Sequence, residues 1–138
     1  MKKLFRRVLC LALCLSFAAN FSAFAASENP VQPYDNFAIS TSIAELSGGG
    51  SRLYLDFTIK CSSTSSTLGV SSITLYDKTT GKSTNYSGKR ANGARTYSDT
   101  ITMSGVSGHS YYALVSFMAT PYSGSTVRSS VVTNTITL

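Results

Sequence analysis

The sequence predicts an all-β protein whose seven antiparallel strands form a β-sandwich. Ser and Thr account for 38 of the 113 residues that follow Ala25, and no stretch repeats apolar residues at helical spacing. Thr, Val, Ile, Tyr and Phe suit a pleated surface that is buried on one side. Alternating apolar and polar segments are separated by turn signals at fairly regular spacing, which is typical of a sandwich with Greek-key connections. A small closed barrel of the same strands is the alternative.

The clearest strand is expected at residues 52–61. Its odd-numbered residues are apolar and its even-numbered residues are polar, so five apolar side chains share one face. One buried face and one wet face are typical of an antiparallel strand. Residues 111–119 repeat the alternation, and Leu114 and Met118 on the second face indicate that this face is partly covered.

Five weaker strands complete the predicted set. They are expected, in chain order, at residues 37–46, 73–77, 82–87, 95–103 and 126–138. A glycine-rich turn at 47–50 follows the first of them, and a turn at 78–81 joins the next two as a hairpin. The polar run at 62–67 (SSTSST) is expected to be a loop.

Residues 1–25 have the order of a cleavable secretory signal peptide. Four Lys and Arg residues lie among the first seven, an apolar run follows at 8–17, and a small-residue stretch ends Ala-Phe-Ala at position 25. The run is shorter than the roughly 20 residues that span a membrane, although an uncleaved anchor is the alternative. We therefore expect cleavage after Ala25 and a secreted, extracellular protein with no transmembrane anchor after cleavage. An extended tail at 26–36 and the β-sandwich domain at 37–138 are expected to remain.

The net charge of +6 belongs mainly to the predicted signal peptide. Four of the twelve Lys and Arg residues lie there, so eight remain beside all six acids and the mature chain would carry +2. Net charge therefore predicts neither a nucleic-acid partner nor an anionic-membrane function. Cys10 and Cys14 lie in the same segment, which leaves Cys61 without an intrachain partner. Cys61 is expected to be a buried free thiol.

The stretch at 106–115 resembles the entry into strand F of fibronectin type III and related immunoglobulin-like domains, in which Gly-x-x-Tyr precedes alternating apolar residues. The resemblance implies that Tyr111 forms a tyrosine corner. The Trp and the paired Cys of antibody domains are missing. The whole layout, including Gln32-Pro33-Tyr34, resembles small secreted immunoglobulin-like proteins of Gram-positive bacteria, which implies a fold and an address but no activity.

The residues needed for catalysis are sparse. Cys61 and His109 are the only thiol and imidazole left, and a sandwich would place them at opposite ends. There is no G-x-S-x-G elbow and no metal-ligand pattern, so neither an enzyme nor a cofactor is predicted. Asp99 has the parity of Tyr97 and Ile101 in its predicted strand, so we expect an edge, a bulge, or a partner such as Arg95 or a Tyr hydroxyl.

Two features could bind a ligand. Tyr54, Tyr76 and Tyr86 supply amphipathic surface, with Tyr76 and Tyr86 expected to face each other across the hairpin. Cross-strand pairing on the wet face is the alternative. A cationic loop, 89–95, could meet an anionic wall polymer, or it could be a solvated loop tip; its cations are Lys89, Arg90 and Arg95.

These features predict a non-catalytic binding or structural domain outside the cell, free or associated with the cell surface. Its expected partner is a protein or a cell-surface glycan, including wall polymers. A secreted hydrolase or other carbohydrate-active protein that uses a tyrosine-lined surface is the alternative. Pairing with a second copy through an exposed edge strand is also open.

Overall fold

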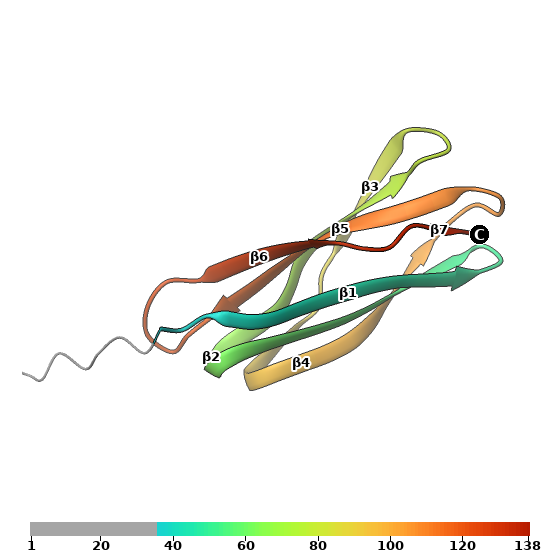
Figure 1. Cartoon of the computed structure of the whole chain (residues 1–138). Coiled ribbons are helices and arrows are strands. Elements are labelled where there is room, and N and C mark those ends of the chain that lie inside the picture. The colour runs from blue at the N-terminus through green and yellow to red at the C-terminus, as the bar shows by residue number, and fades with distance from the viewer. Residues whose placement is uncertain (1–35) are drawn as a thin grey trace, which may run out of the picture. The chain divides into compact units, whose positions relative to one another are not determined.

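The computed structural model describes residues 36–138, and the predicted signal peptide and residues 26–35 of the predicted tail lie outside this range. Within it, no residue is helical and seven strands form an antiparallel sheet (Figure 1). The prediction of an all-β, antiparallel, seven-stranded fold is therefore confirmed. The strands are β1 (Ile39–Gly49), β2 (Arg52–Asp77), β3 (Lys82–Ser87), β4 (Arg90–Ser104), β5 (Ser110–Thr120), β6 (Val127–Val132) and β7 (Ile136–Thr137).

Strand β2 organises the sheet because its 26 residues pair with four other strands. Its first half lies between β1 and the second half of β4, and its second half lies between β5 and the β3–β4 segment. Strand β5 then pairs with β6 and β7. Figure 1 shows β2 turning sharply between its halves, where the register with β4 shifts between Lys60 and Ser65.

The buried hydrophobic residues form one core, to which both halves of β2 contribute. All five odd-numbered residues at 53–61 are buried, as the alternation predicted, and Phe117 and Val115 of β5 are fully buried with them. Leu114 and Met118 are half-buried on the opposite face of β5. Burial of a side chain the size of Phe117 contributes about 1.5–3 kcal/mol to folding.

The prediction of a loop at 62–67 is wrong, because these residues continue β2 through its bend. Some of their hydroxyls bond to chain segments far away in sequence. The Ser66 hydroxyl donates to the carbonyl of Thr120 (2.9 Å), and the Ser62 hydroxyl donates to that of Asn36 (3.2 Å). Ser65 is fully buried, and its hydroxyl has no hydrogen-bond partner within residues 36–138. Serine therefore serves here as a small strand residue, which at positions 62 and 66 also bonds to neighbouring backbone, a role that composition alone does not distinguish from a polar loop.

The strand boundaries differ from the prediction in several places. Strand β1 runs to Gly49, so the predicted turn at 47–50 is instead at residues 50 and 51. The predicted strands at 52–61 and 73–77 are one strand, and the predicted strand at 126–138 is two. Strand β4 starts at Arg90, five residues earlier than expected. The last segment divides because Thr133 leaves the regular ladder: its hydroxyl accepts the Ala113 N–H while its own N–H donates to the Ala113 carbonyl, both at 2.9 Å.

Segments that do not pair as strands also contact each other through side chains. The hydroxyls of Ser42 on β1 and Ser129 on β6 lie 3.0 Å apart. The Lys89 ammonium group reaches the carbonyl oxygen of Thr100 (2.9 Å). Eleven extended residues would span about 36 Å, so β4 must fold back on itself for this contact to form.

Candidate functional site

The three predicted binding tyrosines do not form one surface. The hairpin register pairs Tyr76 with Ser83 and pairs Tyr86 with Ile73. Because Ile73 is buried, Tyr86 lies half-buried on the core side, whereas Tyr76 points outward. The expectation that Tyr76 and Tyr86 face each other is therefore wrong. Tyr54 lies on the outer side of the first half of β2, where it is 36% exposed.

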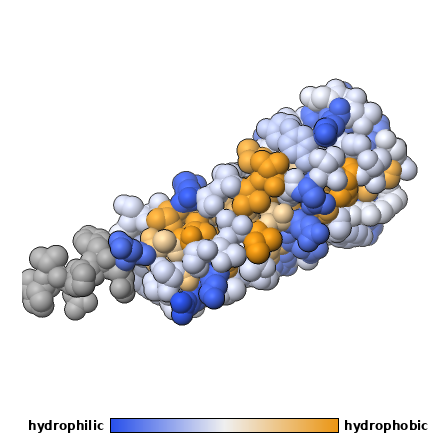
Figure 2. Space-filling view, in the orientation of Figure 1, coloured by the Kyte–Doolittle hydropathy of each residue, from blue (hydrophilic) through white to orange (hydrophobic). Residues whose placement is uncertain are grey.

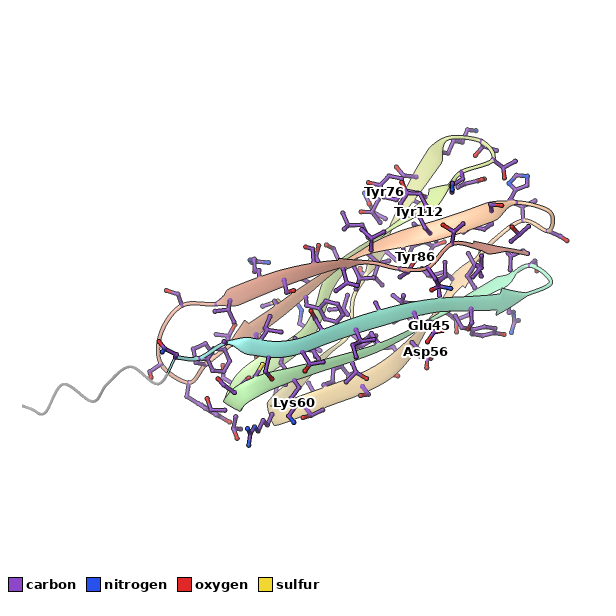
Figure 3. All side chains as sticks on the ribbon, in the orientation of Figure 1. Glu45, Asp56, Lys60, Tyr76, Tyr86 and Tyr112 are labelled. Carbon is purple, nitrogen blue, oxygen red and sulfur yellow. The ribbon has the colours of Figure 1, made fainter. Side chains whose placement is uncertain are left out.

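The partner of Tyr76 is Tyr112, which lies directly opposite it on β5. The ring centroids are 4.9 Å apart and the ring planes differ by 8°, so the rings are stacked. Figure 3 shows the two side chains together on the second half of β2 and on β5. Tyr112 was not among the binding residues predicted from the sequence. The alternation at 111–119 placed Tyr111 on the apolar face, and no local pattern gives the register between β2 and β5.

The tyrosine pair belongs to a larger outer face, which we call the tyrosine face. Cross-strand register and two-residue periodicity place its members on one side of β3, β2, β5 and β6; they are Tyr76, Tyr112, Thr74, Asn85, Leu114 and Val132. The Thr74 hydroxyl donates to the Asn85 amide oxygen (2.9 Å), and Val132 is 61% exposed. None of the six residues carries a charge. Figure 2 shows apolar surface over β6 among mostly hydrophilic residues.

The predicted cationic loop is not a loop beyond Lys89, because Arg90 and Arg95 lie in β4, which pairs with β2. Two of the three cations contact other groups of the same domain at its surface. The Lys89 ammonium group lies 3.0 Å from the Asp99 carboxylate, and the Arg95 side chain donates to the Cys61 carbonyl (3.2 Å). Arg90 is exposed. The segment therefore presents less free positive charge than its sequence suggested.

One of the expected partners of Asp99, a Tyr hydroxyl, is present. Its cationic partner is Lys89 rather than Arg95. The Tyr97 hydroxyl donates to the second Asp99 oxygen (2.8 Å), and the Thr100 N–H donates to the first (2.7 Å). Bonds from Lys89, Tyr97 and the Thr100 amide lower the pKa of Asp99 to about 2. The hydrogen bond to Asp99, together with burial, raises the pKa of the Tyr97 hydroxyl.

A cleft of about 440 Å³ on the β1–β2–β4 side contains three carboxylates, those of Glu45, Asp56 and Asp99. Glu45 and Asp56 are direct cross-strand neighbours, and the Thr100 hydroxyl donates to Asp56 (2.5 Å). Glycoside hydrolysis needs one carboxylic acid that stays protonated near neutral pH. The lowered pKa of Asp99 keeps it ionised, so it cannot take that role.

His109 lines a second cavity, of about 350 Å³, together with Asp77. Its Nδ1 lies 2.8 Å from an Asp77 carboxylate oxygen. Burial alone would raise the pKa of Asp77, but bonds from His109, from the Thr80 side chain and from the Thr79 and Thr80 amides together lower it to about 2. Within residues 36–138, no hydroxyl bonds to the imidazole, so the nucleophile of a Ser-His-Asp triad is not in place.

Two further predicted residues have structural surroundings. Cys61 is fully buried and free, and Tyr111 is 4% exposed, with its hydroxyl accepting the Val106 N–H at 2.9 Å. This is the backbone contact made by a tyrosine corner. Among the residues described, no three His, Cys, Asp or Glu side chains cluster in a way that could hold a metal ion.

Comparison of the chain with known protein families, with curated proteins and with solved structures finds no match in any of the three. In the part of the chain that the structure describes, no helix has the length and apolar character needed to cross a membrane.

Proposed function

We propose that this chain is the precursor of a secreted, immunoglobulin-like β-sandwich that binds a cell-surface glycan without catalysis. The sandwich is supported by the bend of β2 and by the one hydrophobic core to which both of its halves contribute, in which Phe57 of the first half lies edge-on to Phe117 of β5. The bond from the Val106 amide to the Tyr111 hydroxyl supports the immunoglobulin-like class. The address rests on the order of charged, apolar and small residues at 1–25.

The stacked pair of Tyr76 and Tyr112 is the observation that carries the binding proposal. Tyr side chains offer rigid contact area with a polar tip at low cost in conformational entropy. The adjacent amide of Asn85 and hydroxyl of Thr74 can exchange hydrogen bonds with sugar hydroxyls, while Leu114 and Val132 supply apolar contact. None of these six residues is charged, which favours an uncharged glycan over an anionic wall polymer, although Arg128 lies on the same side of β6, opposite Met118.

Binding of the purified protein to neutral soluble polysaccharides tests this proposal. Replacing both Tyr76 and Tyr112 with Ala should weaken binding about tenfold or more, because aromatic contacts of this kind dominate binding sites. Tyr54→Ala is the matched control, since Tyr54 is an exposed tyrosine on the other half of the sheet. Equal loss in both variants, or no binding to any neutral glycan, would contradict the proposal.

The expected address has a separate test. Expression of the full chain in a Gram-positive host, followed by fractionation, should recover the protein outside the membrane with Ala26 as its first residue. Retention in the membrane with an intact N-terminus would instead indicate an uncleaved anchor.

A hydrolase is the second candidate, and one observation favours it. The Asp77 carboxylate contacts His109 at Nδ1, the arrangement by which an acid orients a catalytic imidazole. Turnover of esters or glycosides that is lost in His109→Ala would support an enzyme and overturn the non-catalytic proposal.

A further inference from the structure

The cavity beside His109 lies where the β2–β3 hairpin meets the loop before β5, away from the tyrosine face. Leu75 and Tyr111 provide buried apolar surface in it, each 4% exposed. The Ser and Thr residues that line it are Thr80, Thr84 and Ser104, and its acidic and basic residues are Asp77, Lys82 and His109. Its volume of about 350 Å³ lies within the range of small-molecule sites.

Backbone hydrogen bonds fix the walls of this cavity. The Lys78 N–H donates to the Ser110 carbonyl (2.8 Å), and the Ser110 N–H donates to the Thr79 hydroxyl (3.0 Å). The Asp77 carboxylate also accepts a hydrogen bond from the Thr79 N–H (2.9 Å). A site held in this way loses little conformational entropy when a ligand enters.

The protons at the Asp77–His109 contact can be assigned from the chemistry of the groups. An ionised carboxylate only accepts hydrogen bonds, so His109 donates from Nδ1 and its Nε2 remains available to a ligand. Lys82 lies opposite Asp77 in the hairpin register but belongs to neither ion pair found in residues 36–138, so its ammonium group is available to an anionic ligand.

We propose that this cavity binds a carboxylate-bearing monosaccharide, a uronic acid. One free ammonium group, that of Lys82, matches a single negative charge. The hydroxyls of Thr84 and Ser104 are donors for the carboxylate and the ring oxygens, and Nε2 of His109 can bond to a sugar hydroxyl, which both donates and accepts. Leu75 and the Tyr111 ring offer apolar surface to the sugar ring. The proposal does not depend on the tyrosine face, so either can fail without the other.

Titration of the purified protein with glucuronate, glucose and glucose 6-phosphate, followed by NMR, tests this proposal. Glucuronate should shift the resonances of His109 and Tyr111 in a saturable way, whereas glucose at the same concentrations should not. Lys82→Gln should weaken glucuronate binding about tenfold or more, the loss expected for a charge-assisted hydrogen bond. Lys78→Gln is the matched control, because Lys78 lies on the same turn but outside the cavity lining, and it should change affinity less than twofold.

Each other outcome would overturn the proposal. Equal losses of glucuronate affinity in the two Lys variants would show that binding depends on net charge and not on the position of Lys82. Equal binding of glucose and glucuronate would remove the role of the carboxylate, and tighter binding of glucose 6-phosphate would assign the cavity to phosphate. In the Tyr76→Ala/Tyr112→Ala double variant, glucuronate binding should persist even when binding to neutral glycans is lost.

Discussion

The side-chain amide of Asn134 bonds to both backbone groups of Leu46. It accepts the Leu46 N–H and donates to the Leu46 carbonyl, each at 2.8 Å. Leu46 lies on β1, whose only strand partner within residues 36–138 is β2, so the amide covers part of the free edge of β1. Exposed strand edges are templates for pairing with other chains, and a side chain that occupies one opposes such pairing.

Asn134→Ala should lower the free energy of unfolding by about 1–3 kcal/mol, because it leaves two partly buried backbone groups of Leu46 without a partner. Urea unfolding measures this loss, and light scattering should show increased self-association. Thr135→Ala, at the exposed neighbouring residue, is the control and should change stability by less than about 0.5 kcal/mol. Equal stability of both variants would contradict a role for Asn134 at the edge.

Gly88→Ala should destabilise the protein strongly. A Cβ atom at Gly88 would collide with the backbone carbonyl of Val70, whose N–H donates to the Lys89 carbonyl at 2.8 Å. Backbone cannot yield as a flexible side chain can, so we expect a loss of several kcal/mol. Gly49→Ala is the control, because a Cβ there meets no atom within 4 Å. Thermal unfolding of the two variants makes the comparison.

The sequence predicts well what depends on one strand and one buried face. The alternation at 52–61 identifies the inward residues because the side-chain period of a strand is two, and an error of one residue would expose Leu53 and Leu55 together. The hairpin between the end of β2 and β3 is also predictable from local sequence. Its turn at 78–81 includes Gly81, whose φ of 71° favours glycine.

What the sequence does not predict depends on register between distant segments. Tyr76 and Tyr112 stack only because β2 and β5 pair with these two residues opposite, 36 positions apart. Lys89 meets Asp99 only because the chain bends between them, so a cation expected to bind a ligand instead forms a surface ion pair within the domain. Asp77 and His109 join at the end of the same β2–β5 pairing. No property of these residues taken singly indicates such partners.

Tyr111→Phe tests the backbone contact before β5 without changing the ring. The substitution removes the oxygen that accepts the Val106 N–H, while the phenyl ring still fills the buried position of residue 111. The expected loss is about 1 kcal/mol in the free energy of unfolding. Tyr122→Phe, at a 72% exposed tyrosine, should leave stability unchanged in the same urea titration. A neutral Tyr111→Phe would remove the energetic argument for a tyrosine corner.

The two lowered carboxylate pKa values predict loss of stability in acid. Asp77 and Asp99 have a pKa of about 2 when folded, against 3.8 as the ordinary value. Unfolding raises each pKa, so the unfolded chain binds more protons between these values. Their contribution to stability is therefore complete above about pH 4 and is lost as the pH falls toward 2. Thermal unfolding across this range should show the decline.

Carboxyl-carbon NMR titration can separate the two groups, and each serves as the control for the other. Lys89→Met removes the main cause of the lowered pKa of Asp99, which should rise toward 3.8 while that of Asp77 stays near 2. His109→Ala should do the reverse, because it removes a hydrogen bond that keeps Asp77 ionised. If both values moved in either variant, a general change in folding or net charge would explain the titration better than these two local contacts.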